Sequence, residues 1–365
     1  MAVNILFLAL LRERSGNHCT AARIRSHLDG GKYKCILKNV TNFKDAAEFK
    51  CFLDEKEIQL VVGLHAFHSG RLLQDCPVPY IVIFGGTDVN EHLNYVDRMA
   101  IMTKVVQKAS HIVSFNKTMQ KRARSFWPEE KDAVSGSNQP VVPDESYVNI
   151  PQAVIISPSS FDIKQHLKST GAGHINVQDE LYIFTLVAGI RPVKDPIFLL
   201  NAFSKWHQSE PSRVLLIVGP VIDERYLEEF ESALVNKRGI VYIPGLPFSD
   251  LHAILRDSFA LVNSSLSEGM STALLEGLAL GTPAIVRNIP GNTSVVAHRQ
   301  TGMLYDTPQE FIECAQELID DTSLREHVID NAASLVQEKH SCDVEKTAYL
   351  ALIDSIMSRE QKHFK

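Results

Sequence analysis

The chain has 365 residues, a length that suits two domains better than one. Its 45% hydrophobic and 22% charged residues are typical of a globular protein. The net charge of -6 at pH 7 excludes a general electrostatic attraction to nucleic acid or anionic membranes, and no apolar run reaches the roughly 18 residues that a membrane span needs.

An apolar run, Asn-Ile-Leu-Phe-Leu-Ala-Leu-Leu, occupies residues 4–11. A signal peptide would carry a basic segment before such a run and a small-residue cleavage site after it, and neither is clear here. We therefore interpret the run as the first buried strand of a parallel sheet. The six cysteines form no C-x-x-C pair and no metal-ligand spacing, which indicates reduced thiols and a cytoplasmic protein.

Short apolar runs alternate along the chain with amphipathic or polar stretches of helical length. This alternation predicts an α/β protein with parallel sheets. The strands predicted in the first half are Ile5–Ala9, Cys35–Lys38, Leu60–Leu64, Tyr80–Phe84, Ile112–Phe115 and Val154–Ile156. Those predicted in the second half are Tyr182–Val187, Val214–Val218, Val241–Ile243, Ala260–Asn263 and Ala284–Val286.

The alternation is interrupted around residues 158–180, where serines and glycines replace the apolar periodicity. We interpret residues 161–180 as a connection between a first domain, residues 1–160, and a second domain, residues 181–342. A final helix is predicted over residues 343–362. Its apolar positions are Val344, Ala348, Ala351, Leu352 and Met357.

Three turns in the first half follow predicted strands and carry polar residues or glycine. Gly16 precedes a helix predicted to start near Thr20, although the G-x-G-x-x-G fingerprint is absent. His65 follows the strand that ends at Leu64, and Asp88 follows the next one. Because carboxyl ends of parallel strands share one edge, these turns are expected to face one crevice. The alternatives are a simple tight turn, a structural histidine and a helix-capping aspartate.

In the second half, Ala-Gly-Ile-Arg-Pro-Val-Lys-Asp follows the predicted strand Tyr182–Val187 and contains Arg191 and Lys194. The stretch lies at the carboxyl end of a strand, where open α/β sheets bind ligands. The two cations can stabilise negative charge on a departing diphosphate. Alone, they are better explained as solvated bases in a loop, and only together with the carboxylate segment described next do they favour a functional role.

The most informative segment is residues 267–283, Ser-Glu-Gly-Met-Ser-Thr-Ala-Leu-Leu-Glu-Gly-Leu-Ala-Leu-Gly-Thr-Pro. Glu268 lies just before Gly269 at a predicted helix start, and Glu276 about two turns inside. The helix N-terminus suits an anion such as a diphosphate, and the carboxylates can accept hydrogen bonds from sugar or ribose hydroxyls. The segment therefore predicts a nucleotide-sugar site. The alternatives are a glutamate favoured by the helix dipole and a surface glutamate.

The loop after the next predicted strand reads Arg-Asn-Ile-Pro-Gly-Asn over residues 287–292. It either borders the donor or acceptor site or is a loop shaped by Pro290 and Gly291. Because Arg191, Lys194 and the helix terminus can stabilise the leaving diphosphate, the predicted site needs no metal, and the sequence offers no obvious metal-ligand cluster.

With these residues assembled, the chain resembles the retaining glycosyltransferases of glycosyltransferase family 4. The string from Glu268 to Pro283 resembles the E-x7-E block of that family. The likeness is strong from about Leu181 to Tyr305 and weaker but continuous through the first half. The resemblance implies the GT-B fold, in which two Rossmann-like domains face each other across a cleft and the last helix crosses back onto the first domain.

The resemblance also implies roles for single residues. Glu268 would bind hydroxyls of the donor sugar, Glu276 the ribose hydroxyls, and His65 would lie near the transferred sugar. The residues expected at the diphosphate are Arg191, Lys194 and, from the other domain, Gly16. The backbone amides expected to meet the sugar and diphosphate belong to Gly269, Met270, Ser271 and Thr272.

Two departures from the family pattern stand out. Only two residues separate Arg191 from Lys194, and Met270 replaces the usual phenylalanine. The implied reaction moves a sugar from a nucleoside-diphosphate sugar, with a UDP-sugar preferred, to an acceptor hydroxyl, with retained anomeric configuration and without metal or bound cofactor. The alternatives are a non-catalytic nucleotide-sugar-binding protein and a sugar-nucleotide epimerase. The sequence indicates neither the acceptor nor an oligomeric state.

Overall fold

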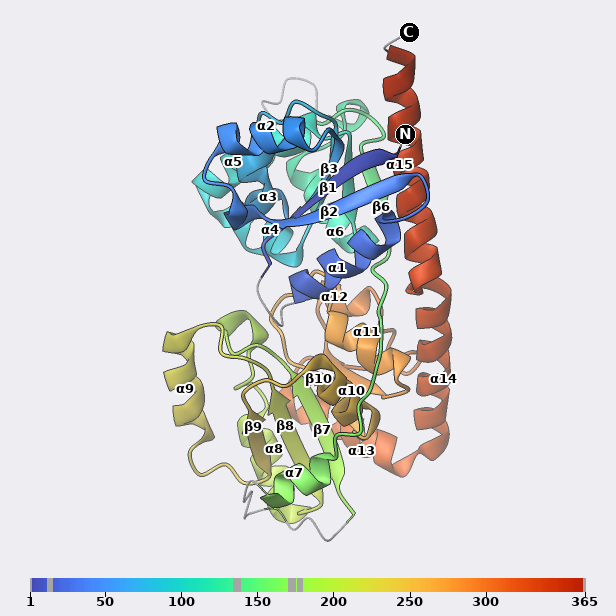
Figure 1. The fold of residues 1–365 in the computed structure, drawn as a ribbon. Coiled ribbons are helices and arrows are strands. Elements are labelled where there is room, and N and C mark those ends of the chain that lie inside the picture. The colour runs from blue at the N-terminus through green and yellow to red at the C-terminus, as the bar shows by residue number, and fades with distance from the viewer. Residues whose placement is uncertain (1, 12–15, 134–138, 170–174, 176–179, 364–365) are drawn as a thin grey trace. The chain divides into compact units, whose positions relative to one another are not determined.

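The computed structural model describes residues 2–11, 16–133, 139–169, 175 and 180–363. The chain divides into two compact units, which we describe separately (Figure 1). Unit 1 consists of Met1–Ala153 together with Ser341–Lys365, and unit 2 consists of Val154–His340. Within the described residues, no helix combines the length and apolarity needed to cross a membrane.

Unit 1 is built on a six-stranded parallel sheet with the strand order β2-β1-β3-β4-β5-β6. Its strands are β1 (Val3–Ala9), β2 (Tyr33–Asn39), β3 (Ile58–Leu64), β4 (Tyr80–Ile83), β5 (His111–Ser114) and β6 (Tyr147–Asn149). Its helices are α1 (Gly16–Leu28), α2 (Ala46–Glu55), α3 (Ala66–Leu73), α4 (Gly86–Asn90), α5 (Val96–Lys108), α6 (Lys117–Phe126) and α15 (Cys342–His363). Short 3-10 helices lie at η1 (Val40–Asn42), η2 (His92–Asn94) and η3 (Glu130–Asp132).

The last strand of unit 1 differs from the prediction. The expected strand Val154–Ile156 is wrong, and the sixth strand is β6, seven residues earlier. Val154 donates its N–H to the carbonyl of His340, and the side chains of Ile155 and Ile156 are exposed to 57% and 37%. The apolar run therefore has strand composition without a sheet neighbour to pair with.

Unit 2 has a second six-stranded parallel sheet, with the order β12-β11-β10-β7-β8-β9. Its strands are β7 (Tyr182–Val187), β8 (Arg213–Val218), β9 (Ile240–Ile243), β10 (Ala260–Asn263), β11 (Ala284–Arg287) and β12 (Met303–Tyr305). Its helices are α7 (Ile163–Ser169), α8 (Leu200–Ser209), α9 (Glu224–Leu234), α10 (Phe248–Arg256), α11 (Thr272–Ala279), α12 (Pro290–Thr293), α13 (Pro308–Asp320) and α14 (Thr322–Lys339). A 3-10 helix, η4 (Pro192–Lys194), follows β7.

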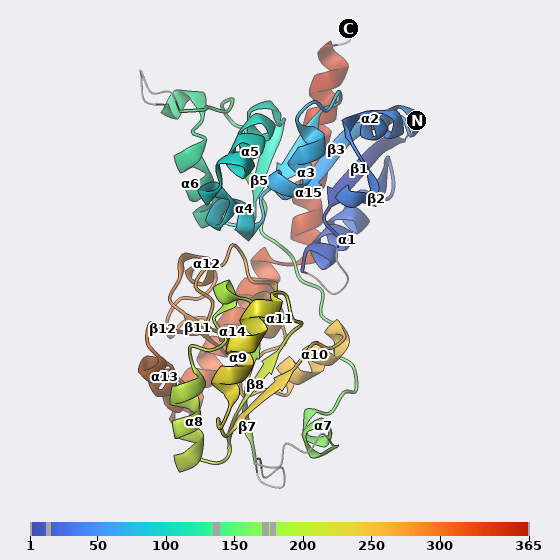
Figure 2. The ribbon, with the colours of Figure 1, turned by 90° about the vertical axis from the view of Figure 1, so that its left-hand side faces the viewer.

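Helices cover both faces of the unit 2 sheet (Figure 2). Phe184 of β7 packs into one apolar core with residues of α8, α9 and α13. Its neighbour Ile183 points to the other face and packs with residues of α10, α11 and α14. The strand is apolar throughout because both of its faces are buried.

The strand order of each sheet locates a ligand-binding edge. In unit 2 the order reverses between β7 and β10, so the loops that leave these neighbouring strands run to opposite faces and open a crevice between them. In unit 1 the same reversal lies between β1 and β3. The residues after β7 and β10, and those after β1 and β3, therefore form two candidate binding edges.

The segment expected to connect the domains carries structure of its own. The first crossing between units lies between Ala153 and Val154, ahead of the expected connection at residues 161–180. Within that stretch, α7 buries Ile163 and Leu167 in the core of unit 2 because both lie on one helix face. Residues 170–174 and 176–179 lie outside the described residues.

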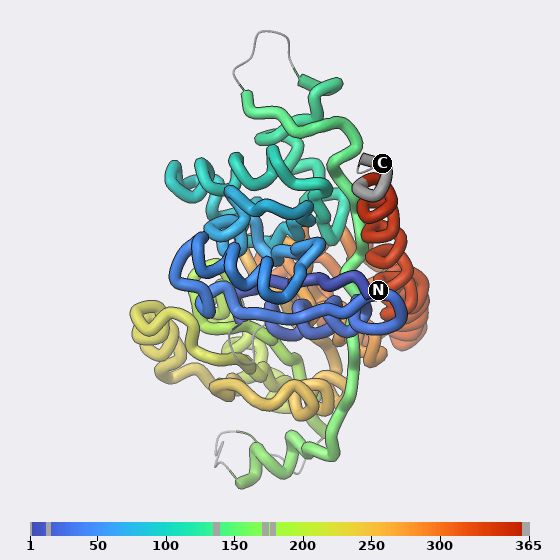
Figure 3. Tube along the Cα trace, turned by 45° about the horizontal axis from the view of Figure 1, so that its top comes forward, coloured from blue at the N-terminus to red at the C-terminus, as the bar shows by residue number. Residues whose placement is uncertain are grey.

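The C-terminal helix α15 returns to unit 1, where it contacts α1 (Figure 3). A buried salt bridge joins the two helices: Glu345 accepts hydrogen bonds from Arg23 Nε at 2.7 Å and Nη2 at 3.0 Å. The same carboxylate lies 3.0 Å from His27 Nε2 and accepts the N–H of Ala153 at 3.0 Å. Burial would raise the pKa of Glu345, but these partners hold it below its ordinary value.

Candidate nucleotide-sugar site

The loops after β7 and β10 bring Lys194 and Glu268 into contact. Lys194 Nζ lies 2.5 Å from Glu268 Oε1, which also accepts hydrogen bonds from Ser265 Oγ at 2.7 Å and Asn263 Nδ2 at 3.2 Å. Burial alone would raise the pKa of Glu268, but the charge of Lys194 and these hydrogen bonds outweigh it and lower the pKa. The glutamate is therefore a preorganised, ionised acceptor at the predicted edge.

Backbone and side-chain hydrogen bonds fix these two loops to each other. Leu266 donates its N–H to the carbonyl of Val193 at 2.9 Å, and Ser264 Oγ donates to the carbonyl of Lys194 at 3.0 Å. Arg191 lies at the start of the same turn, as the residue before η4, and is half-buried. The two cations predicted for the diphosphate thus share one short turn beside Glu268.

The loop after β11 supports Glu268 from a third direction. Asn292 Nδ2 donates to Asn263 Oδ1 at 3.0 Å, and Asn263 in turn donates to Glu268. A Cβ atom on Gly291 would lie 2.4 Å from the backbone oxygen of Glu268, so only glycine allows this approach. This loop, for which the sequence left open a place at the site border or a simple turn, therefore packs against the backbone of Glu268.

Arg287 braces the same loops, a role that the sequence did not indicate. Its Nη1 atom lies 2.8 Å from Asp195 Oδ2 and 3.1 Å from the carbonyl of Ser264. Its guanidinium carbon also lies 3.9 Å from the centre of the Phe198 ring, a cation–π contact. Asp195 adopts a left-handed conformation with φ of 43°, which turns the chain after Lys194.

The helix of the motif starts later than predicted. Ser271 is its N-cap, with Oγ accepting the N–H of Leu274 at 3.3 Å, and α11 begins at Thr272. Glu276 is therefore about one turn inside the helix rather than two. Serine is a much better N-cap than glutamate, which leaves Glu268, Gly269 and Met270 in the preceding loop.

Glu276 lies on the buried side of α11, among leucines of the unit 2 core. Its Oε1 atom is 3.5 Å from Nε2 of His252, a buried residue of α10. Sequence reasoning missed His252 because it stands on a separate helix with no local motif. The two carboxylates predicted for the donor site thus each lie beside a nitrogen-bearing side chain, Glu268 beside Lys194 and Glu276 beside His252.

In unit 1, the start of α1 and the turn after β3 meet at His65. Its Nε2 atom lies 3.1 Å from Asn17 Oδ1 of α1, and its Nδ1 atom lies 3.2 Å from Thr87 Oγ1. His65 has φ of 68° and ψ of 117°, a conformation that costs a non-glycine residue energy. Gly16 is the first residue of α1, a helix expected only from Thr20, and Ser15 lies outside the described residues.

Asp88 holds this arrangement together. Its buried carboxylate accepts the N–H groups of Ala66 at 3.0 Å and Phe67 at 3.2 Å, and that of Gly85 at 2.9 Å. It therefore caps the start of α3 and, by accepting the N–H of Gly85, also the start of α4, in which Asp88 is the third residue. Oδ2 also lies 3.3 Å from His65 Nδ1; despite burial, which opposes ionisation, the charge of His65 and these hydrogen bonds lower the pKa of Asp88.

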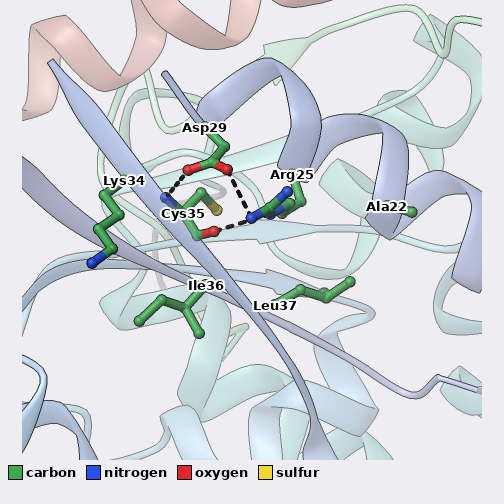
Figure 4. A pocket seen from close by; sticks show the side chains of 7 residues that line it. All are labelled: Ala22, Arg25, Asp29, Lys34, Cys35, Ile36 and Leu37. Atoms are coloured by element: carbon green, nitrogen blue, oxygen red, sulfur yellow. Dashed lines mark hydrogen bonds and ion pairs between the residues drawn. The ribbon is translucent and has the colours of Figure 1, made fainter. Parts of the chain in front are cut away.

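The described residues contain no group of three or more His, Cys, Asp or Glu side chains that could hold a metal ion. A pocket of about 540 Å³ lies elsewhere in unit 1, on α1 and β2 (Figure 4). There Asp29 accepts the N–H of Cys35, and Arg25 donates to the carbonyl of Cys35. This pocket contains none of the predicted site residues, and Arg25 and Asp29 bond the backbone of only one residue, Cys35, of the edge strand β2.

Comparison with known proteins points to one family. The family profile described as glycosyl transferases group 1 matches residues 173–335. Glycosyltransferase 1 domain-containing protein 1 of Xenopus tropicalis is 35% identical over 352 residues, which cover 96% of this chain and 97% of the relative. The UDP-Gal:alpha-D-GlcNAc-diphosphoundecaprenol alpha-1,3-galactosyltransferase of Escherichia coli is 27% identical over 49% of this chain and 48% of its own length.

Solved structures share the fold at low sequence identity. Anabaena HepE in complex with UDP and glucose superposes with a TM-score of 0.75 and 14% identity, over 97% of this chain and 100% of that one. Sucrose-phosphate synthase of Thermosynechococcus elongatus gives a TM-score of 0.75 and 14% identity, over 98% and 100%. The two parallel sheets match these GT-B structures, and the near-full-length relative shows that the chain belongs to the glycosyl transferases group 1 family.

Proposed function

We propose that the protein is a retaining glycosyltransferase of family 4 that moves a sugar from a nucleoside-diphosphate sugar to an acceptor hydroxyl. The contact between Lys194 and Glu268 carries this proposal. A cation suited to a diphosphate and a carboxylate suited to sugar hydroxyls lie side by side at the sheet edge where α/β proteins bind ligands.

The donor is a UDP-sugar in this proposal. Family relatives supply the support: the E. coli relative is named for a UDP-Gal donor, and HepE has been solved with UDP-glucose. In the proposed complex, Glu268 accepts hydrogen bonds from sugar hydroxyls, and Glu276 accepts them from the ribose. The backbone amides of Gly269, Met270, Ser271 and Thr272 meet the sugar and diphosphate.

The reaction breaks the bond between the anomeric carbon and the diphosphate oxygen and forms a bond to the acceptor oxygen on the same face. Positive charge builds on the sugar and negative charge on the leaving diphosphate. Lys194, Arg191 and the positive end of the α11 dipole stabilise the diphosphate, so the proposed mechanism needs no metal. The acceptor proton moves to the departing diphosphate.

Unit 1 supplies Gly16 and His65 in this proposal. His65 is held by Asn17, Thr87 and Asp88, which limits its rotation. A histidine fixed in this way can contact the transferred sugar with little loss of side-chain entropy on binding. Gly16, without a side chain, allows the start of α1 to approach the diphosphate closely.

The first experiment is a thermal-shift screen of the purified protein against UDP, GDP, ADP and their common sugars. Binding to the folded state raises the melting temperature by mass action, by an amount that follows ligand concentration relative to Kd. A shift with UDP and UDP-sugars, but not with GDP or ADP, supports the proposal. The absence of a shift with all of them contradicts it.

Turnover is tested next, by following UDP release from the shifting donor with and without candidate acceptor alcohols in EDTA. The anomeric configuration of the product, read by NMR, tests retention. Activity that disappears in EDTA and returns with Mg²⁺ contradicts metal independence, and an inverted product contradicts retention.

The shortened spacing between Arg191 and Lys194 favours one alternative, a protein that binds nucleotide sugars without turning them over. The same two measurements separate the candidates. A clear UDP-sugar shift with no UDP release, across acceptors and in their absence, supports the binding protein.

A further inference from the structure

A buried histidine faces the carboxylate that is proposed to bind ribose. His252 of α10 is only 4% exposed, and its Nε2 atom lies 3.5 Å from Oε1 of Glu276 on the neighbouring helix α11. The side chain of Glu276 is itself 8% exposed. A carboxylate with so little access to water needs a polar neighbour to offset its burial, and His252 is positioned to be that neighbour.

The other ring nitrogen of His252 fixes where its hydrogen lies. Nδ1 accepts the backbone N–H of Ser157 at 3.1 Å, so in the neutral ring the hydrogen is on Nε2 and points toward Glu276. Ser157 belongs to the extended segment beside α10, which is anchored there by Ser159: Ser159 donates its N–H to the carbonyl of Ser249 and its hydroxyl to Asp250. The ring orientation is therefore set by main-chain contacts outside the motif.

The Nε2–H group is not satisfied in this state. Among the described residues, buried His252 Nε2 has no hydrogen-bond partner, and its 3.5 Å separation from Glu276 Oε1 is longer than an ordinary N–H···O hydrogen bond. A histidine with a purely structural role is expected to bond through both nitrogens when buried this deeply. An unused donor aimed at Glu276 costs free energy here, and a small movement of the carboxylate would recover it.

We propose that His252 is a positioning residue: it holds one oxygen of Glu276 so that the other accepts hydrogen bonds from the ribose hydroxyls of the bound nucleotide. This inference rests on the proposed function, because it requires a nucleoside diphosphate in the site. It assigns to His252 the selection of ribose over 2′-deoxyribose. When one oxygen of the Glu276 carboxylate is held in place, the other is presented to the ribose in a fixed direction. A nucleotide that lacks the 2′-hydroxyl then binds more weakly, because this oxygen loses a hydrogen-bond donor.

Two substitutions test the roles of the two ring nitrogens of His252 separately. His252→Asn places an amide oxygen near Nδ1, so it keeps the acceptor for Ser157 and loses the donor to Glu276. His252→Gln places an amide nitrogen near Nε2 and keeps that donor. The two variants have similar polarity and volume, so a general loss of packing affects both.

The readout is the ratio of the Kd for 2′-deoxy-UDP to the Kd for UDP, measured by calorimetry on the full-length protein. We expect the unmodified protein to prefer UDP by about tenfold or more, as one charge-assisted hydrogen bond implies. His252→Asn is expected to lower this ratio at least about threefold, and His252→Gln to keep it within about twofold. A residue that only supports the fold would weaken both ligands equally and leave the ratio unchanged.

Glu276→Asp provides a second test should His252→Asn fail to fold. It retains the charge but withdraws the carboxylate from Nε2 by one methylene, so the ratio is expected to fall as well. A ratio that stays unchanged in folded His252→Asn, or in folded Glu276→Asp where His252→Asn does not fold, overturns the inference.

The outcome also distinguishes this inference from the proposed function. If the unmodified protein binds UDP and 2′-deoxy-UDP equally, Glu276 does not read the ribose and the inference falls, while nucleotide binding stands. If it binds neither, nor any other nucleoside diphosphate, the proposed function falls and the inference falls with it.

Discussion

Lys194 and Glu268 are 74 positions apart in the chain, yet Nζ of the lysine lies 2.5 Å from Oε1 of the glutamate. The contact joins the loops that leave two adjacent strands of unit 2. A diphosphate that binds Lys194 competes with Glu268 for the same ammonium group. Its binding would release the carboxylate to accept hydrogen bonds from the sugar, which links the two halves of the donor.

Lys194→Ala is expected to weaken UDP binding by about 10- to 100-fold, the loss of one charge-assisted hydrogen bond. Calorimetric titration with UDP measures this. Lys205→Ala is the matched control, because Lys205 is an exposed residue of α8 outside the site. The Kd of this control variant for UDP should equal that of the unmodified protein. An unchanged Kd for Lys194→Ala would place the diphosphate elsewhere.

Glu268→Ala is expected to separate binding from transfer. Removal of the carboxylate frees Lys194, so the Kd for UDP should stay equal or become smaller. The kcat/KM for the UDP-sugar should fall about 100-fold or more, because the sugar hydroxyls lose an ionised acceptor. Transfer at the unmodified rate would show that the sugar binds at another position.

Gly291→Ala tests the packing behind Glu268. The new methyl group would start 2.4 Å from the backbone oxygen of Glu268, so either the loop after β11 or the Glu268 loop must move. We expect the variant to have a lower melting temperature than the unmodified protein. We also expect the shift in melting temperature caused by UDP-sugars to decrease more than the shift caused by UDP. Thermal-shift titrations with the two ligands measure the difference. Equal losses with both would mean that the loop does not support the sugar side of the site.

Glu345→Gln tests the buried salt bridge of unit 1. The substitution leaves Arg23 buried without its counter-charge, which is expected to destabilise unit 1 by about 3 kcal/mol. Urea denaturation followed by fluorescence measures it. Glu326→Gln, an exposed position of α14, is the control and should lie within about 0.5 kcal/mol of the unmodified protein.

The same pair predicts a pH dependence. The pKa of Glu345 is lower in the folded state than its ordinary value of 4.5, so its contribution to stability is full above that value. The contribution is lost as pH falls through the folded pKa. The difference in stability between the unmodified protein and Glu345→Gln should therefore shrink below about pH 4.5. A difference that stays constant down to pH 3 would contradict the assignment.

The sequence predicted most strands because buried parallel strands are continuous apolar runs, as β7 and β10 illustrate. It did not predict β6 or β12, whose three residues are too short for a clear pattern. Nor could it reject Val154–Ile156, since an apolar run does not show whether a neighbouring strand is present. Pairing partners depend on the whole sheet rather than on local residues.

The sequence placed Lys194 and Glu268 after two strands, and the carboxyl ends of parallel strands share one edge of the sheet, but it did not predict that β7 and β10 are neighbours. The sequence did not predict which other side chains contact these residues and their loops. His252 and Arg287 reach the site from other elements, and no periodicity or spacing relates them to the motif. The helix start was also misplaced, because the choice between Glu268 and Ser271 as N-cap depends on where the loop hydrogen bonds go.

The return of α15 to unit 1 has a consequence for synthesis on the ribosome. Unit 2 is one continuous segment, Val154–His340, whereas unit 1 needs both chain ends. Until residue 345 has left the exit tunnel, Arg23 has no buried carboxylate to pair with. The first 153 residues, although they are made first, therefore lack their last helix until nearly the whole chain has emerged, and they remain incomplete and accessible to chaperones until then.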